Sequence, residues 1–368
     1  MRIAIDAHQI SGRSRGIETY LYNLVKYLAR CGPNGNKYAV YLDPGQDVEG
    51  LDANPSFERR RIPSSLAPIR YGFHYPLQSW ERCFDVFHAQ FSLPPFLRCL
   101  SVLTIHDISY ERFPEFFTRR VRALFKILVP WSCRRADHII TMSESSKRDL
   151  VETYRLDPRR ITVTYQAAAE NCRPLDREQS RDRVKETYGI DSPFILYVGS
   201  LEPRKNLSRL LEAFAQLKHE GRLPHKLVIV GRKAWLYDGI FETLRKHSLE
   251  GEVALTGYVP NDDLPLFYNA ATFMVYPSVY EGFGLPVVEA MACGTPVITS
   301  LGSSLEEIAH GAALLIDPYS VASIAAAMHK LADSPALQRD LRCAALARAA
   351  GFSFGRMAEQ TREVYHQL

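Results

Sequence analysis

The chain has 368 residues, of which 46% are apolar and 23% charged, with a net charge of +4. A chain of this length usually forms more than one hydrophobic core, so we expect two domains. It contains no uncharged apolar run of about 18 residues, which excludes a membrane-spanning helix. Its seven cysteines are scattered without a Cys-x-x-Cys pair, which argues against a disulfide framework or a structural zinc site.

Short β-branched runs alternate with longer helical patterns in both halves of the chain. Strands are expected at residues 2–6, 38–42, 86–88, 102–106, 138–142 and 161–165, and then at 194–198, 226–230, 253–255, 273–276, 296–299 and 313–316. Helical patterns lie between them, for example at 19–30, 119–135, 207–218, 264–270, 287–292 and 320–332. This alternation is typical of α/β domains with doubly wound parallel sheets, and it occurs twice.

The interdomain connection is expected around residues 168–178, where the pattern breaks near Arg173 and Pro174. The predicted domains are therefore residues 1–173 and 174–351. The segment 1–6 reads as a strand rather than a signal peptide, so we expect a cytoplasmic protein.

Positive charge is concentrated in the first half. Residues 1–172 contain 24 Lys and Arg against 18 Asp and Glu, whereas the remainder has 21 against 23. Basic clusters lie at residues 59–61, 119–126 and 134–135. Such clusters attract anionic lipid headgroups or phosphate-bearing partners, although a solvated face is the simpler interpretation. We do not expect a nucleic-acid partner, since the basic residues form no known binding motif with aromatic ones.

Ligands of doubly wound sheets bind beyond the carboxyl ends of the strands. The seventh strand is followed by Gly199, Glu202, Arg204 and Lys205, and the eighth by Gly231. Two fixed cations beside a helix N-terminus suit a diphosphate, although solvated basic residues are the alternative.

The most informative stretch is residues 281–289, Glu-Gly-Phe-Gly-Leu-Pro-Val-Val-Glu. Gly282 and Gly284 allow close approach of the backbone to a ligand, and the N–H groups of the following helix favour an anion. Glu281 and Glu289 can accept hydrogen bonds from sugar hydroxyls. An ordinary strand-to-helix turn with solvated glutamates is the alternative.

These residues carry a resemblance to the retaining glycosyltransferases of family 4, which have the two-domain GT-B fold. Glu281 and Glu289 reproduce that family's E-x7-E motif, and residues 202–206 resemble its phosphate-binding motif. Residues 297–304, 311–318 and 352–357 are also similar, and the resemblance is strongest from residue 194 onward. It implies an acceptor-binding first domain, a nucleotide-sugar-binding second domain, and a terminal helix at 352–368 that packs back on the first domain.

The resemblance also implies roles for individual residues. Arg204 and Lys205 would neutralise the diphosphate leaving group, Glu281 would contact the transferred sugar, and Glu289 would bind the ribose hydroxyls. The backbone N–H groups of Phe283, Gly284 and Leu285 would donate hydrogen bonds to the sugar and the phosphates.

In the first domain, residues 104–107 resemble the family's His-Asp loop. His106 would face the donor sugar, next to Asp107, although a lone histidine at a strand end is often structural. Residues 12–18 correspond to a glycine-rich first loop that approaches the donor phosphates. This chain has a single Gly16 there, so Arg15 would supply a cation where relatives commonly have adjacent glycines.

The overall pattern most resembles bacterial mannosyltransferases of surface-polysaccharide assembly. It implies a hexosyltransferase that uses GDP-mannose and a lipid-linked acceptor, needs neither metal nor cofactor, and contacts the inner face of the membrane. A UDP-sugar donor, or a catalytically inactive nucleotide-sugar-binding scaffold, is the alternative. No nucleophile is evident, so we favour front-face attack over double displacement.

Overall fold

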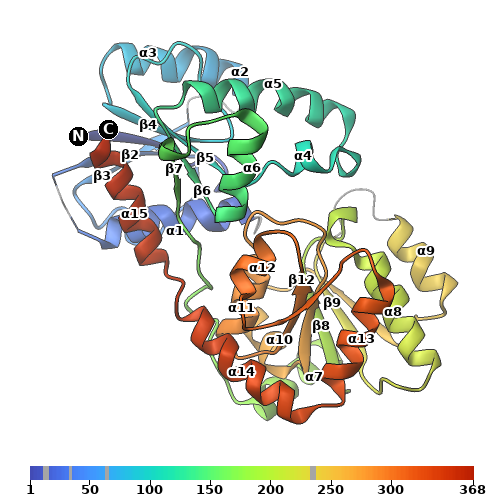
Figure 1. Ribbon diagram of the computed structural model, residues 1–368. Coiled ribbons are helices and arrows are strands. Elements are labelled where there is room, and N and C mark those ends of the chain that lie inside the picture. Colours follow the sequence, from blue (N-terminus) through green and yellow to red (C-terminus); the bar gives the residue numbers. More distant parts are fainter. Residues whose placement is uncertain (11–15, 33–34, 63–65, 233–237) are drawn as a thin grey trace. The chain divides into compact units, whose positions relative to one another are not determined.

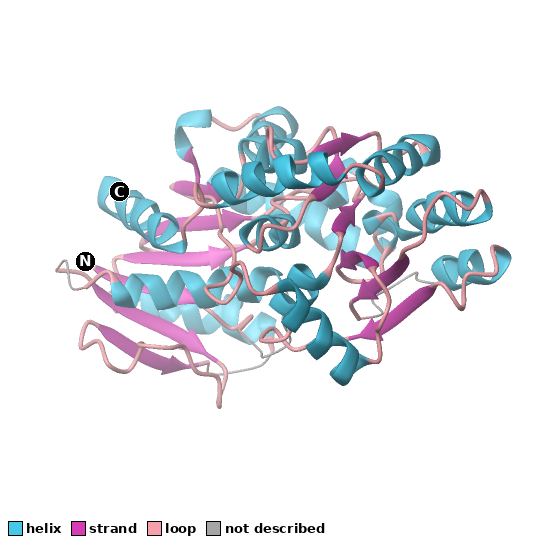
Figure 2. Cartoon of the chain, turned by 90° about the horizontal axis from the view of Figure 1, so that it is seen from below, coloured by secondary structure: helices cyan, strands magenta, loops and turns pink. Residues whose placement is uncertain are grey.

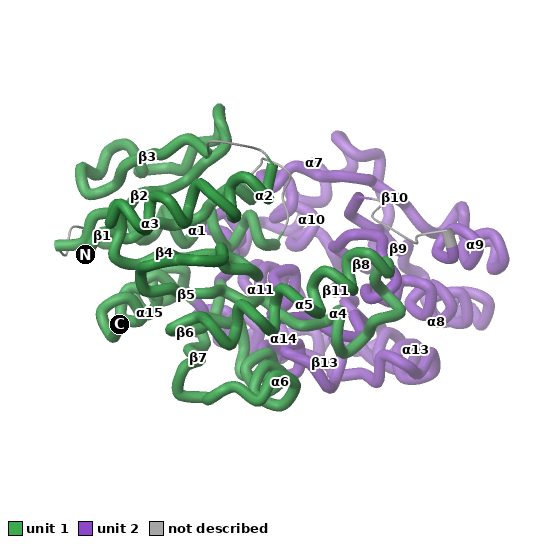
Figure 3. The backbone as a smooth tube through the Cα atoms, turned by 90° about the horizontal axis from the view of Figure 1, so that it is seen from above, with its two compact units in different colours: residues 1–166, 353–368 green, residues 167–352 purple. Residues whose placement is uncertain are grey.

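The computed structural model describes residues 1–10, 16–32, 35–62, 66–232 and 238–368. The chain divides into two compact units, coloured separately in Figure 3. Unit 1 comprises Met1–Gln166 and Ser353–Leu368, and unit 2 comprises Ala167–Phe352. The division falls after Gln166 rather than after Arg173, because the intervening segment bonds to unit 2. For example, the Asn269 side chain donates to the carbonyl of Arg173 over 3.0 Å.

Unit 1 contains a seven-stranded sheet in which every neighbouring pair is parallel. Its strands are β1 (Arg2–Asp6), β2 (Lys37–Leu42), β3 (Phe57–Arg61), β4 (Val86–Gln90), β5 (Leu100–Ile105), β6 (His138–Thr141) and β7 (Ile161–Val163). The strand order is β3-β2-β1-β4-β5-β6-β7, so the direction of winding reverses between β1 and β4. This reversal is the topological switch point at which doubly wound sheets bind ligands.

Helices cover both faces of this sheet, with α1 and α15 on one face and α3 and α5 on the other (Figure 1). The helical elements are α1 (Gly16–Arg30), α2 (Ala67–Ile69), η1 (Arg70–His74), α3 (Tyr75–Trp80), α4 (Ser109–Arg112), η2 (Pro114–Phe116), α5 (Arg119–Arg135), α6 (Glu144–Tyr154), η3 (Pro158–Arg160) and α15 (Phe354–Gln367). The terminal helix α15 belongs to unit 1 and packs against α1. The Tyr365 hydroxyl lies 2.6 Å from Nδ1 of His88, a buried histidine on β4.

Unit 2 contains a six-stranded parallel sheet. Its strands are β8 (Phe194–Val198), β9 (Lys226–Val230), β10 (Val253–Gly257), β11 (Phe273–Tyr276), β12 (Val297–Ser300) and β13 (Leu314–Ile316). The order β10-β9-β8-β11-β12-β13 reverses between β8 and β11. Figure 2 shows the strands of each unit running side by side.

The helical elements of unit 2 connect these strands. They are α7 (Arg177–Tyr188), η4 (Pro203–Lys205), α8 (Leu207–His219), α9 (Asp238–Lys246), α10 (Leu264–Ala270), α11 (Leu285–Ala292), α12 (Ser304–Ala309), α13 (Val321–Ala332) and α14 (Pro335–Ala349). Strands β8, β9 and β11 consist almost entirely of buried apolar residues, as expected for a sheet covered on both faces.

Candidate active site

Two loops of unit 2 meet at the switch point of its sheet. The loop after β8 carries η4 and Asn206, and the loop after the neighbouring β11 carries residues 277–284. The Val279 N–H donates to the carbonyl of Arg204 over 2.9 Å, which joins the two loops. The Asn206 side chain also donates to the carbonyls of Pro277 and Pro318, over 3.0 and 2.6 Å. The turns are therefore held together by backbone carbonyls rather than by apolar packing alone.

Glu281 lies between the two predicted cations. Its Oε1 is 2.6 Å from Nζ of Lys205, and its Oε2 is 2.9 Å from a guanidinium nitrogen of Arg204. The side chains of all three are at most 14% exposed. The tertiary structure thus brings together three of the residues that the sequence predicted to be catalytic.

Opposite charges decide the protonation state of Glu281. Burial by itself would raise its pKa, but Arg204 and Lys205 outweigh burial and lower the pKa to about 2. The carboxylate is therefore ionised at neutral pH. It also accepts hydrogen bonds from the hydroxyls of Ser278 and Tyr276, over 2.6 and 3.1 Å. Buried carboxylates persist only with such a set of partners.

The two cations are largely compensated within the protein. Arg204 also pairs with Glu202 over 2.8 Å, so two carboxylates face two cations. Lys205 donates to Glu281 and to the Tyr276 hydroxyl, both over 2.6 Å. An ammonium has three protons, and the described residues accept two of them, which leaves the third for a ligand. A phosphate oxygen could therefore bind Lys205 without breaking its contact with Glu281.

Two glycines predicted to lie at the site, Gly231 and Gly284, allow neighbouring segments to approach one another closely. A Cβ at Gly231 would lie 1.8 Å from the carbonyl oxygen of Gly199, so a side chain at 231 is excluded. Gly284 has a φ of +102°, and a Cβ there would lie 2.5 Å from a methyl carbon of Leu305. Both positions require glycine, as the sequence indicated.

Gly284 is the N-terminal boundary of α11, which begins with Leu285. The first N–H groups of a helix have no intrahelical acceptor, and the helix dipole favours an anion there. Gly282 and Phe283 are buried in the same turn, and the Ser304 hydroxyl lies 2.7 Å from the carbonyl oxygen of Glu281. Ser304 therefore anchors the turn that precedes α11.

Glu289 lies one turn into α11 and has a different environment from Glu281. It is partly buried, and its Oε2 accepts a hydrogen bond from the Tyr268 hydroxyl over 2.7 Å. Burial raises its pKa, against a smaller lowering by Tyr268. The pKa values of the two glutamates thus shift in opposite directions, because among the described contacts only Glu281 has cationic partners.

His106 in unit 1 is 8% exposed and follows β5. Its Nε2 lies 3.1 Å from Oε1 of Gln90, the last residue of β4. The ring stacks on Phe91 at 5.5 Å and contacts Tyr20 edge-on at 4.9 Å. Burial lowers the pKa of His106 to about 4, although Asp107 opposes this. The imidazole is therefore neutral at pH 7.

The other residues of unit 1 that were predicted to lie at the site make fewer described contacts than His106 does. Asp107 accepts a hydrogen bond from the Ser109 N–H over 2.8 Å, which is a local turn contact. Gly16 is exposed at the start of α1. Arg15 lies outside the described residues.

Sequence reasoning did not single out several polar partners. Tyr276 and Ser278 orient Glu281, Tyr268 bonds Glu289, and Gln90 bonds His106. Tyr276 and Gln90 are the final residues of central strands, and this position could have identified them as site residues from the sequence. Tyr268 lies in the middle of α10, and its position in the sequence gives no such signal.

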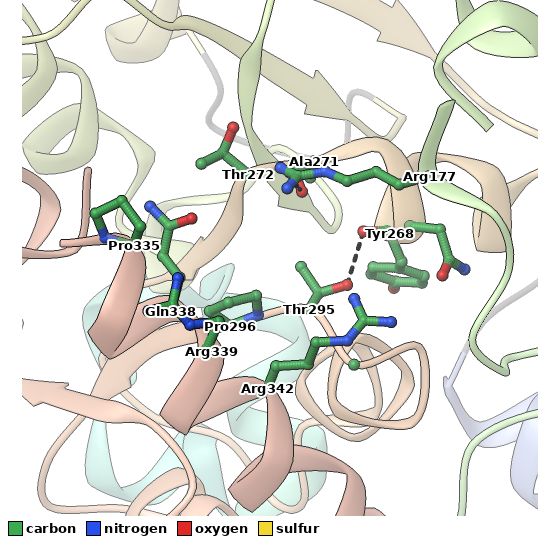
Figure 4. Close-up of a pocket in the computed structure, with 12 residues that line it drawn as sticks. Arg177, Tyr268, Ala271, Thr272, Thr295, Pro296, Pro335, Gln338, Arg339 and Arg342 are labelled. Carbon is green, nitrogen blue, oxygen red and sulfur yellow. Dashed lines mark hydrogen bonds between the residues drawn. The ribbon is translucent and has the colours of Figure 1, made fainter. Parts of the chain in front are cut away.

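A separate cavity of about 230 Å³ lies in unit 2, at the amino ends of β11 and β12 (Figure 4). Arg177, Arg339 and Arg342 line it together with Thr272 and Thr295. None of the predicted site residues lines this cavity, because they follow the carboxyl ends of the strands.

Among the residues that the structure describes, no group of three or more His, Cys, Asp or Glu side chains is arranged to hold a metal ion. None of the described helices is long and apolar enough to cross a membrane.

Two protein-family models match the chain. Glycosyltransferase Family 4 matches residues 14–167, and Glycosyl transferases group 1 matches residues 178–348. The chain is 34% identical to O-antigen chain mannosyltransferase B of Escherichia coli, over 73% of this chain and 70% of that protein. It is 30% identical to D-inositol 3-phosphate glycosyltransferase of Streptomyces bingchenggensis, over 96% of this chain and 85% of that protein.

Solved structures show the same fold. The crystal structure of Anabaena HepE in complex with UDP and glucose superposes with a TM-score of 0.77 at 19% identity, covering 100% of both chains. Two parallel-sheet domains of this kind define the GT-B fold. The chain belongs to the family 4 glycosyltransferases.

Proposed function

We propose that this glycosyltransferase transfers mannose from GDP-mannose, with retention, to a lipid-linked or polysaccharide acceptor in cell-surface glycan synthesis. The observation that carries the proposal is the buried cluster of Glu281, Arg204 and Lys205 at the switch point of unit 2. The 34% identity to an O-antigen chain mannosyltransferase supports mannose as the transferred sugar.

The cluster suits the charge changes of sugar–phosphate cleavage. Negative charge develops on the leaving diphosphate, and positive charge develops at the anomeric carbon. In the proposal, the remaining proton of Lys205, the Arg204 guanidinium and the N-terminus of α11 stabilise the diphosphate. Glu281, ionised by its cationic partners, faces the developing positive charge of the sugar. Glu289 accepts hydrogen bonds from the ribose hydroxyls beside its contact with Tyr268.

We further propose that the reaction proceeds by front-face attack and without a divalent metal. The Glu281 carboxylate accepts a charge-assisted hydrogen bond from the Lys205 ammonium. It also accepts hydrogen bonds from the neutral hydroxyls of Ser278 and Tyr276. A carboxylate fixed in this way is a poor nucleophile. The departing phosphate would therefore accept the proton of the acceptor hydroxyl, and the two cations would serve in place of a metal.

The membrane contact is proposed on the surface of α5. Five of its large apolar side chains are 37–70% exposed, namely Val121, Leu124, Ile127, Leu128 and Trp131. Exposed arginines lie at both ends of the helix, including Arg119, Arg120, Arg134 and Arg135. An amphipathic helix with this composition binds at an anionic lipid surface. The cluster at residues 59–61 contributes less, because Arg59 and Arg60 pair with neighbouring carboxylates.

A donor screen tests the catalytic proposal. The protein is incubated with GDP-mannose, UDP-glucose, UDP-galactose or UDP-N-acetylglucosamine, without added metal, and free nucleotide is measured by mass spectrometry. We expect slow release of GDP from GDP-mannose, with a loss of about 100-fold or more in Glu281→Ala and in Lys205→Ala. Release from a UDP-sugar alone would replace the donor, and release that Glu281→Ala retains would refute the site.

Cosedimentation with vesicles tests the membrane contact separately. The double variant Leu124→Glu, Ile127→Glu should lose binding to phosphatidylglycerol vesicles, whereas Tyr319→Glu, which replaces an exposed aromatic residue of unit 2, should retain it. Equal binding of both variants, or equal binding to phosphatidylcholine vesicles, would contradict the role of α5.

A further inference from the structure

A buried carboxylate in unit 1 has no part in the donor chemistry described above. Asp6 is the last residue of β1, is fully buried, and lies at the switch point of its sheet beside β4. Three side chains donate to it, and the backbone N–H of His8 lies 3.4 Å from Oδ1. Nδ1 of His8 lies 2.8 Å from Oδ1, the Tyr75 hydroxyl lies 3.0 Å from the same oxygen, and the Tyr71 hydroxyl lies 2.7 Å from Oδ2.

These contacts fix the protonation state of the carboxyl. Burial would raise the pKa of Asp6, but His8, Tyr71 and Arg70 together lower it. An ionised carboxylate can only accept hydrogen bonds, so the imidazole must donate from Nδ1. In the neutral imidazole the lone pair then lies on Nε2. Asp6 therefore sets both the tautomer and the orientation of His8.

The second ring nitrogen of His8, Nε2, has no hydrogen-bond partner among the described residues. The side chain is 21% exposed, whereas that of Asp6 is fully buried. The described hydrogen bond of the ring is the one between Nδ1 and Asp6. In the same turn, Oε1 of Gln9 is buried without a described partner. Tyr71 is partly buried and meets the imidazole edge-on, with ring centroids 6.4 Å apart, which places an aromatic ring beside the histidine.

We infer that His8, oriented by Asp6, Tyr71 and Tyr75, binds the acceptor: its Nε2 accepts a hydrogen bond from a hydroxyl of the acceptor sugar. The inference rests on the proposed function and deepens it, since it locates the second substrate. Aromatic rings beside a hydrogen-bonding nitrogen suit the alternating C–H and O–H groups of a hexose.

The location favours the acceptor over the donor. The charged groups proposed to bind the diphosphate, the sugar and the ribose belong to unit 2, whereas this cluster belongs wholly to unit 1 and is separate from His106, the unit 1 residue expected to face the donor sugar. His8 follows β1 at the switch point of the unit 1 sheet, as Arg204 follows β8 at the switch point of the unit 2 sheet. The role assigned to His8 is binding, so no proton transfer is required of it.

Two variants separate acceptor binding from a merely structural role. In His8→Asn the side-chain amide can still donate to Asp6 from near the position of Nδ1, but the variant has no group at the position of Nε2. In His8→Ala both are lost. Each variant is assayed with GDP-mannose and octyl α-D-mannoside as the acceptor probe, and in parallel for GDP release without acceptor.

Both variants should raise KM for octyl mannoside about three- to tenfold, the effect of one lost hydrogen bond, with acceptor-free GDP release unchanged. A wild-type KM in His8→Asn would overturn the inference, as would an equal loss of acceptor-free release. Wild-type protein that releases GDP but does not glycosylate the probe would remove the proposed acceptor class. Failure of the proposed function can be distinguished from failure of this inference, because the wild-type protein would then release no GDP from GDP-mannose.

Discussion

The substitution Glu281→Gln tests the electrostatics of the unit 2 cluster most directly. It preserves the size of the side chain but leaves Arg204 and Lys205 without their shared carboxylate. A buried carboxyl whose pKa falls from 4.5 to about 2 on folding contributes about 3 kcal/mol at neutral pH, at about 1.4 kcal/mol per pH unit. Breaking a buried ion pair on one side costs a similar amount, about 3–5 kcal/mol.

The pH dependence has a definite sign. The pKa of Glu281 is lower in the folded than in the unfolded protein, so its contribution is fully present above pH 4.5 and is lost as the pH falls towards 2. The glutamine variant lacks this contribution at every pH. The difference in unfolding free energy between the two proteins should therefore shrink from about 3 kcal/mol at pH 7 to about 1 kcal/mol at pH 3.

Differential scanning calorimetry at several pH values measures this difference. For a domain the size of unit 2, a loss of about 3 kcal/mol lowers the melting temperature by about 6–12 °C. The control is Glu220→Gln, which removes an exposed carboxylate that pairs with Arg222 and should leave melting unchanged. A stability difference below about 1 kcal/mol at pH 7, or one that is independent of pH, would refute the reasoning.

Three further substitutions probe the two units. Gly284→Ala should destabilise unit 2 by about 1–3 kcal/mol, because φ is +102° and the added methyl meets Leu305; urea unfolding that matches the wild type would contradict this. Tyr365→Phe should cost about 1 kcal/mol through the lost bond to buried His88, seen as faster proteolysis of α15. Gln90→Leu should shift the ¹⁵N resonances of the His106 ring by releasing its tautomer while the fold is retained; an unchanged spectrum would exclude Gln90 as the residue that orients it.

Much of the fold was predictable from local patterns. Strands β8, β9 and β11 were predicted with the bounds that the structure has, because buried parallel strands read as short continuous apolar runs. Strand β3, Phe57–Arg61, was missed. Its sequence Phe-Glu-Arg-Arg-Arg has no apolar pattern, since it is an edge strand that pairs through its backbone with β2. The same arginines had been interpreted only as a basic cluster.

The glycine requirements were also readable in the sequence. Gly231 and Gly284 stand at strand ends before or within turns, where close backbone approach and positive φ are expected. Helix α14, Pro335–Ala349, was not predicted, because it carries only two buried residues and its apolar face is narrow.

The sequence by itself determined the α/β class, most strand positions and the residues that follow each strand, because these depend on local periodicity and turn chemistry. Only the tertiary structure decided which strand ends are neighbours. Strand order is set by packing between distant segments, and it places Lys205 against Glu281 although 76 positions separate them. The ionisation of Glu281, the contrasting environment of Glu289 and the pairing of Asp6 with His8, Tyr71 and Tyr75 depend on burial and on contacts made by that packing, for which no local pattern carries the information.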